Sequence, residues 1–390
     1  MLRALMIVHA FVLPGLLFAQ QPDPAPQPLL SLPTAAARGK AARAEHPALS
    51  PLLQLGLDWL QKHQDADGRW NSDDFMQHDG EQPTDGAGNA GYDVALTGLS
   101  LLALAREGPA SAKDARGQAL QRGAAWLATQ QSNKGLLGGT AAQDFIYGHA
   151  MGTLGLCATF AATGDAATKD PAQHALEYLD RHRNPYAVWR YQPRDNDNDS
   201  SVTTWATMAV LAGVETELRV NSHALRFVGM WFDQVTDPDG RAGYSKVGEA
   251  SSRKVGDHAT RFPPEHGEAM TAAMLLCRGG CGFTKKTHPA LNKSVALLLG
   301  KPPAWDAEAG QIDLCYWLFA TEGLRRVDPA AHATWGKALV DALTKGQRSD
   351  STFAGSWDPI DPWGENGGRI YSTALAVLAL QSCYPVAATK

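Results

Sequence analysis

Three carboxyl groups stand close together between residues 195 and 199. Asp195, Asp197 and Asp199 are separated only by asparagines, and an apolar segment follows them directly. Carboxyl groups held close together repel each other's charge, so that one of them can retain a proton and serve as a general acid. We therefore predict these three residues as candidate catalytic acids. The alternative is a polar loop whose alternating side-chain oxygens bind Ca²⁺.

Further polar residues stand at the beginnings of six apolar segments. A cluster of polar groups above an apolar core is a plausible ligand site. The alternative for each Asp is a helix cap, which satisfies free backbone N–H groups and suits the helix dipole. The candidate ligand-binding residues at these positions are Asp93, Tyr147, His149, His266, Glu268, Asp313, Arg369 and Tyr371.

Two kinds of predicted helix alternate along the chain after residue 50. Six are almost wholly apolar and rich in small residues, which predicts burial on all sides; they cover residues 93–105, 147–163, 201–212, 268–277, 313–324 and 371–381. Six amphipathic helices precede them, at residues 51–64, 119–131, 172–182, 222–234, 289–299 and 331–345. We predict an all-α fold, a single (α/α)6 toroid with the apolar helices inside.

The direction of the helices gathers the polar residues at one place. Alternating helices make all inner helices parallel, so their first residues meet at one mouth of the toroid. An open α-solenoid is the competing fold. Wholly apolar second helices disfavour it, because the concave face of a solenoid meets water.

The N-terminus indicates export. Arg3 precedes an apolar run that is too short to cross a bilayer comfortably, which predicts a signal peptide at residues 1–20 and a periplasmic or extracellular protein. We expect a disordered Pro/Ala-rich linker at 21–50, the toroid at 51–390, and no transmembrane span after cleavage. Of the five cysteines, Cys277 and Cys281 are close enough in sequence for pairing to stay an open question.

Charge excludes one class of partner. The 390-residue chain has a formal net charge of −5 and no basic stripe, so we expect no nucleic-acid partner. No cofactor or metal is expected, and the sequence does not identify a protein partner.

A sequence motif recurs along the chain. Gln64 is followed by Gly68 and Trp70, and the segment from Gly123 to Gln131, Gly135 and Leu137 repeats the pattern. The motif resembles the QW repeat of squalene–hopene and oxidosqualene cyclases, whose superfamily includes protein prenyltransferase β subunits and has the α/α toroid fold. The resemblance looks closest to exported bacterial members, many from planctomycetes, whose activity is unassigned.

The resemblance implies two kinds of chemistry. Such cyclases protonate a terpene with an Asp-x-Asp-Asp motif, which the 195–199 stretch resembles except that Asn198 replaces one Asp, and they usually need two barrels. Prenyltransferase β subunits bind zinc through an Asp-x-Cys pair and a His. Asp313 and Cys315 match the pair, but Ser372 stands where the His is expected. Two of three ligands do not make a zinc site, so we predict none.

Carbohydrate chemistry is a third alternative. Asp199 and Glu268 could act as a carboxyl pair, and Tyr147, Trp189, Trp205 and Trp363 could stack on sugar rings. The repeat fixes the fold more firmly than the activity. We predict an exported protein that binds an apolar, isoprenoid-like or glycan ligand at the polar mouth. The alternatives are a cyclase-like enzyme and a polysaccharide-acting enzyme.

Overall fold

Two concentric rings of helices form the molecule in the computed structural model, which describes residues 25–28, 30, 32, 49–254 and 256–383. The inner ring contains α2 (Asp93–Ala105), α4 (Phe145–Thr163), α6 (Ser200–Glu215), α9 (Ala269–Gly280), α11 (Leu314–Val327) and α13 (Gly364–Gln381). The outer ring contains α1 (Ser50–Lys62), α3 (Ala115–Thr129), α5 (Ala166–His182), α7 (His223–Val235), α10 (Leu291–Leu299) and α12 (Pro329–Gly346). A five-residue helix, α8 (Asp257–Arg261), lies in a connecting loop.

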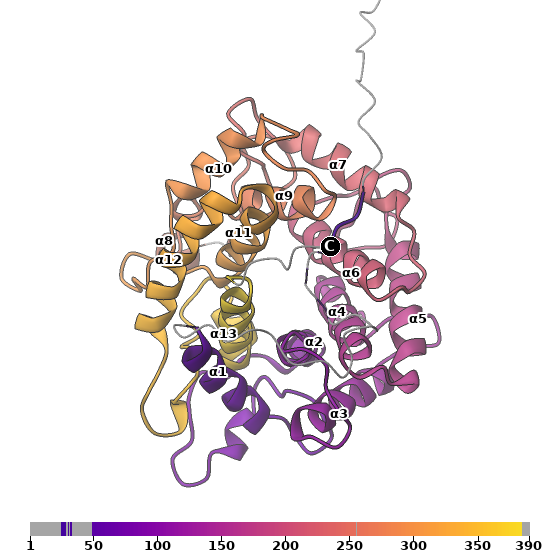
Figure 1. Ribbon diagram of the computed structural model, residues 1–390, viewed down its shortest axis with the longest axis vertical. Coiled ribbons are helices and arrows are strands. Elements are labelled where there is room, and N and C mark those ends of the chain that lie inside the picture. Colours follow the sequence, from indigo (N-terminus) through magenta and orange to yellow (C-terminus); the bar gives the residue numbers. More distant parts are fainter. Residues whose placement is uncertain (1–24, 29, 31, 33–48, 255, 384–390) are drawn as a thin grey trace, which may run out of the picture.

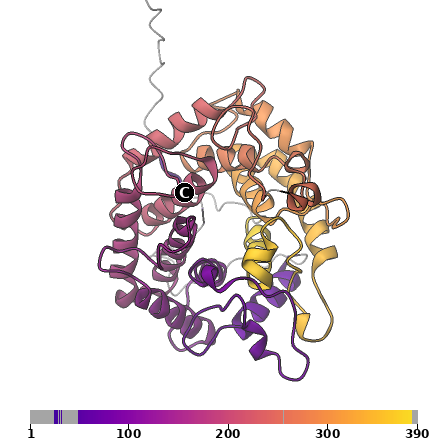
Figure 2. The same cartoon turned by 180° about the vertical axis from the view of Figure 1, so that it is seen from behind.

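Each inner helix contacts its two neighbours, and α13 returns to α2, so the ring is closed (Figure 1). The view from behind shows the same closed ring (Figure 2). Within the described ranges the chain forms no strand, only three isolated β-bridges. The predicted (α/α)6 toroid is confirmed.

The inner helices are buried because their side chains are small and apolar. All residues of α2 except Val94 are buried. Gly98 on α2 faces Gly155 on α4, and a Cβ on Gly155 would lie 2.6 Å from the Cα of Gly98. The two glycines therefore allow the backbones of α2 and α4 to approach closely.

Among the described helices, α4 is long and apolar enough to span a bilayer, although most of it is buried inside this molecule.

Three glutamines fasten the outer helices to one another. The side-chain amide of Gln64 donates to Gly68 O at 2.8 Å and to Ala119 O of α3 at 2.9 Å. Gln131 does the same with Gly135 O and Pro171 O of α5. Gln347, which the sequence analysis missed, joins Gly355 O to Leu52 O of α1 and so closes the outer ring.

A buried ionic cluster ties the first and last repeats together at the far end of the toroid, away from the N-terminal ends of the inner helices. Glu322 on α11 is fully buried and lies 2.9 Å from Nη2 of Arg106, just after α2, and 2.7 Å from Nη2 of Arg325. It also accepts a hydrogen bond from Ser382 Oγ, just after α13, at 2.6 Å. One carboxylate therefore joins the ends of three inner helices.

The far end also holds part of the expected linker. The carboxylate of Glu215 accepts the backbone N–H groups of Leu30 at 2.7 Å and Leu32 at 3.0 Å, and both leucine side chains are buried. These residues differ from the disorder that we expected, because their apolar side chains pack against the helix ends. The predicted signal peptide and most of the linker lie outside the described residues. Cys277 and Cys281 are buried free thiols.

Candidate functional site

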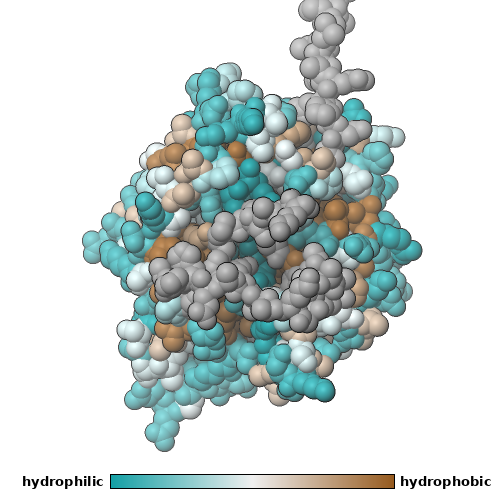
Figure 3. All heavy atoms as spheres, viewed as in Figure 1, coloured by the Kyte–Doolittle hydropathy of each residue, from teal (hydrophilic) through white to brown (hydrophobic). Residues whose placement is uncertain are grey.

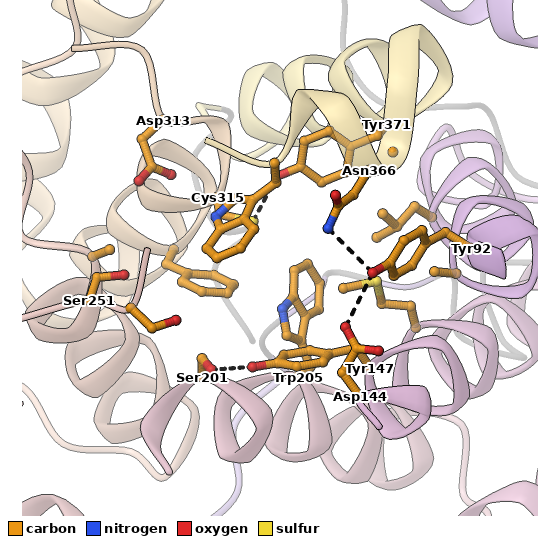
Figure 4. A pocket seen from close by; sticks show the side chains of 18 of the residues that line it. Tyr92, Asp144, Tyr147, Ser201, Trp205, Ser251, Asp313, Cys315, Asn366 and Tyr371 are labelled. Atoms are coloured by element: carbon orange, nitrogen blue, oxygen red, sulfur yellow. Dashed lines mark hydrogen bonds between the residues drawn. The ribbon is translucent and has the colours of Figure 1, made fainter. Parts of the chain in front are cut away.

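A cavity of about 190 Å³ opens at the N-terminal ends of the inner helices (Figure 4). All six inner helices contribute to it, which confirms that their first residues meet at one mouth. Seen from the side of Figure 1, the toroid surface is a mixture of polar and apolar residues (Figure 3). An apolar cavity of ~150 Å³ is enough to admit benzene, so this cavity has room for an organic group.

Aromatic and aliphatic side chains form most of the cavity wall. The large aliphatic side chains of the wall are those of Leu96, Leu99, Met151 and Met270. Trp205 and Phe319 pack edge to face with ring centroids 5.2 Å apart. The aromatic residues that line the cavity are Tyr92, Tyr147, Tyr191, Trp205, Tyr244, Phe319, Trp363 and Tyr371.

A hydrogen-bond network behind the wall holds several of these rings. The carboxylate of Asp199 accepts the hydroxyl groups of Ser201 at 3.1 Å and Tyr244 at 3.2 Å, and it caps α6 through Val202 N. Tyr147 hydrogen-bonds to Ser201, and Tyr191 to Tyr244. Asp199 is fully buried, and this burial raises its pKa to about 6. Asp199 therefore orients the wall and does not itself line the cavity.

Four carboxylates near the inner-helix starts are each paired with an arginine. Each arginine compensates the negative charge of its carboxylate, because a buried charge without a partner strongly destabilises the fold. The distances between the paired atoms are 3.3 Å for Arg69–Asp93, 3.4 Å for Arg190–Asp199, 2.9 Å for Arg241–Glu268 and 3.2 Å for Arg253–Asp313. In the first and third pairs the arginine directly follows an Asp-Gly turn, at Asp67-Gly68 and Asp239-Gly240.

Asp144 differs from these four carboxylates. It lines the cavity at the start of α4, and its one side-chain hydrogen bond within the described chain comes from Tyr92 Oη at 3.2 Å. Asn366 Nδ2 donates to the same tyrosine oxygen at 3.3 Å. Figure 4 shows this chain of hydrogen bonds from Asn366 through Tyr92 to Asp144 along one side of the cavity.

The predicted ligand-binding residues divide into three groups. Tyr147, Asp313 and Tyr371 line the cavity. Asp93 lies behind the wall, where it accepts Ser72 N at 2.9 Å and pairs with Arg69. The remaining residues, His149, His266, Glu268 and Arg369, do not line it.

His149 faces the outer helices. Its Nδ1 accepts Leu137 N at 3.1 Å and its Nε2 donates to Ala175 O of α5 at 3.1 Å, so both ring nitrogens are occupied. Complete burial lowers the pKa of His149 to about 3, which keeps the imidazole neutral. His149 therefore joins an inner helix to its outer neighbours.

Arg369 is also a structural residue. Its guanidinium donates to Asp85 O at 2.8 Å and to Ser356 Oγ at 3.1 Å, and Nη1 lies 2.7 Å from Asp358. The side chain is 1% exposed. The guanidinium holds two loops against α13, and no part of it reaches the cavity.

His266 and Glu268 lie beyond the cavity wall. The imidazole of His266 is exposed and bonds to Ala309 O at 2.8 Å. Glu268 lines a second cavity of about 340 Å³, together with Arg241 and Lys301. This second cavity adjoins the first through Ser251, Ala269 and Met270, which line both.

The acidic loop does not bring its carboxyl groups together over the cavity. Asp195 and Asp197 are exposed on the surface, where Asp195 accepts Asp197 N and Asp197 pairs with Arg190 at 2.7 Å. Only Asp199 is buried, and it caps a helix. Asn196, which lies between the two exposed carboxyl groups, adopts φ +64° in this loop.

The Asp313–Cys315 pair is not arranged as a metal site. Cys315 Sγ lies 3.1 Å from Tyr371 Oη, and Asp313 accepts Tyr316 N as the cap of α11. Across the described residues, no group of three or more His, Cys, Asp or Glu side chains is placed to bind a metal.

Several cavity residues were missed from the sequence. Tyr92 and Asn366 lie just before the apolar segments, and Tyr191 and Tyr244 lie in the long loops before α6 and α8. The signal that could have identified Tyr92 and Asn366 is their position at an inner-helix start, next to residues already selected. The loop tyrosines carry no such signal.

Comparison with known proteins supports the fold. No family model matches the chain, and no relative is found among curated proteins. Solved structures are similar: a protein from Actinoplanes (TM-score 0.52, 16% identity, 86% of this chain and 99% of that one) and the apo type II terpene cyclase MstE from Scytonema (0.51, 16%, 86% and 98%). An alpha-amylase from Clostridium perfringens is similar as well (0.50, 12%, 85% and 97%). The chain thus has the α/α toroid fold that terpene cyclases and other toroid proteins share.

Proposed function

We propose that this protein binds an apolar ligand of the isoprenoid class in the cavity at the mouth of the toroid. The observation that carries the proposal is the wall itself, in which eight aromatic rings stand together with Leu96, Leu99, Met151 and Met270. Burial of hydrocarbon against such a surface contributes ~0.8 kcal/mol per methylene. The Scytonema cyclase of the same fold has been seen with geranylgeranyl dihydroxybenzoate and with merosterolic acid A.

A glycan fits this cavity less well. Sugar hydroxyl groups need hydrogen-bond partners when they leave water, and Leu96, Leu99, Met151 and Met270 offer none. The predicted carboxyl pair also fails to form at the cavity, because Asp199 lies behind the wall and Glu268 lies in the second cavity. The aromatic and aliphatic part of the wall therefore favours hydrocarbon over carbohydrate.

Binding is proposed here in preference to proton-initiated cyclisation. A general acid needs a protonated carboxyl that faces its substrate. In the described chain, the carboxyls with a raised pKa are Asp93 and Asp199, each about 6, and Asp361, about 7, all because of burial. None of them lines the cavity. We also propose that the protein acts after export, on the strength of the apolar N-terminal segment.

The test is a titration of intrinsic tryptophan fluorescence with farnesol, since Trp205 and Trp363 both line the cavity. We expect a saturable change in emission. Ala95→Phe places a ring into the cavity from α2 and should abolish that change. Ala125→Phe on the exposed face of α3 is the matched control and should bind normally. Equal farnesol binding by both variants and the wild type would contradict the proposal.

A further inference from the structure

We propose that the ligand carries a positively charged amine or ammonium group, which Asp144 holds beside the aromatic wall. This inference rests on the proposed function, because it concerns the head group of the same apolar ligand. It adds a charge and an anchoring residue that the apolar character of the cavity does not by itself require.

The inference rests first on the charged residues that line the cavity. Two carboxylates, Asp144 and Asp313, line the cavity, and no Lys, Arg or His in the described chain does so. Asp313 is neutralised by Arg253 at 3.2 Å. Asp144 has no ion pair within the described ranges and accepts only the Tyr92 hydroxyl. The wall therefore presents one uncompensated negative group.

Lys254, a cation behind the wall that contacts Asn366, is engaged by other groups. Lys254 Nζ donates to Asn366 Oδ1 at 2.8 Å and lies 3.4 Å from Glu365. Because Asn366 gives its oxygen to Lys254, its amide nitrogen faces Tyr92, whose hydroxyl proton then points at Asp144. This orientation leaves the other lone pairs of Asp144 free to accept from a ligand.

Aromatic rings beside Asp144 supply the second part of a cation site. Tyr92 donates a hydrogen bond to it, Tyr147 stands one turn further along α4, and all three residues line the same cavity (Figure 4). Cations are attracted to the faces of such rings, and aromatic cages recognise organic ammonium groups in this way. A phosphate or carboxylate head group at this position would instead meet the unpaired carboxylate of Asp144, and no Lys, Arg or His among the described residues lines this cavity.

The experiment compares three ligands with one hydrocarbon chain: farnesylamine, farnesol and farnesoate. At pH 7 the amine is protonated. We expect the amine to bind tighter than the alcohol by about tenfold or more, which is typical of a hydrogen bond to a charged group. We expect the carboxylate to bind weakest.

Asp144→Asn isolates the charge. Asp144 makes no side-chain capping bond to α4, so the variant keeps the helix start intact. The ratio of amine to alcohol affinity should fall toward one in Asp144→Asn. Asp170→Asn on the exposed face of α5 removes the same charge far from the cavity and should leave the ratio unchanged.

The outcomes separate the two proposals. A ratio near one in the wild type, a ratio that Asp144→Asn does not lower, or tightest binding of farnesoate would overturn the ammonium site while leaving apolar binding intact. If none of the three ligands binds, the proposed function fails instead.

Discussion

Replacement of Glu322 by Gln should destabilise the toroid strongly, because this carboxylate joins α11 to the ends of α2 and α13. Glu322 is fully buried between Arg106 and Arg325, at 2.9 and 2.7 Å. Glutamine keeps the shape of the side chain and an acceptor for Ser382. The two buried guanidinium groups lose the negative charge that they share.

The size of the effect follows from the pKa of Glu322. Although burial alone would raise it, the charges of Arg325 and Arg106 dominate and lower the pKa from 4.5 to about 2. That difference corresponds to roughly 3 kcal/mol of folding free energy at neutral pH. Loss of one partner of a buried ion pair typically costs ~3–5 kcal/mol, so the two lines of reasoning agree.

The pH dependence of stability gives a second, independent test of the role of Glu322. Because the pKa is lower in the folded state, the stabilisation is complete above the unfolded pKa of 4.5 and disappears as the pH falls toward 2. Between pH 7 and pH 3.5 the wild type should therefore lose about 1 kcal/mol more than Glu322→Gln does.

Urea unfolding at both pH values measures these quantities. The matched control is Glu177→Gln, since Glu177 pairs with Arg219 on the surface, where the two side chains are 38% and 82% exposed. Such a pair contributes ~0–1 kcal/mol. Equal losses of stability in the two variants would refute the role of Glu322 in closing the ring.

Three further predictions concern stability and are all read from urea midpoints. Gly68→Ala should lower the free energy of unfolding by more than ~2 kcal/mol, because φ is +104° and a Cβ would collide with the carbonyl of Arg122. Gly80→Ala, at φ +75° in open space, should lower it by only ~1 kcal/mol. Equal losses in the two variants would count against the close packing at Gly68. Burial raises the pKa of Asp361 to about 7, so this carboxyl group binds more protons in the folded than in the unfolded protein. The free energy of unfolding should therefore fall as the pH rises from about 4 to 7, and Asp361→Asn should flatten that slope. An unchanged slope would contradict the raised pKa of Asp361. Leu30→Ala should lower the free energy of unfolding by ~2 kcal/mol or more, because Leu30 is fully buried. Leu55→Ala, at a half-exposed position, should lower it by less than ~0.5 kcal/mol. Similar losses in the two variants would show that the N-terminal segment does not pack on the toroid.

Much of the fold could be predicted because burial on all sides leaves a clear pattern in sequence. The predicted inner helix at 93–105 matches α2 in full, and the other helices differ mainly at their ends. The largest difference is α13, which begins seven residues earlier than predicted. Its first turn is separated from the rest by Gly368 at φ +63°, so the glycine-rich sequence conceals that turn.

The site could be predicted only in part, because position at a helix start does not fix the direction of a side chain. Asp93, Asp199 and Glu268 stand at the predicted mouth, yet they pair with Arg69, Arg190 and Arg241 behind the wall or in the second cavity. His149 turns outward because two backbone groups of other elements satisfy its ring. Such long-range partners leave no local signal in the sequence.

The central claim is that an apolar ligand occupies the cavity at the mouth, and photoaffinity labelling tests it most directly. The full-length protein would be labelled with a farnesol analogue that carries a diazirine, and the modified residues would be mapped by mass spectrometry. We predict labels on cavity residues such as Met151, Met270 and Phe319, all lost with excess farnesol or in Ala95→Phe. Labels confined to exposed apolar residues such as Met230 and Val247 would contradict the claim.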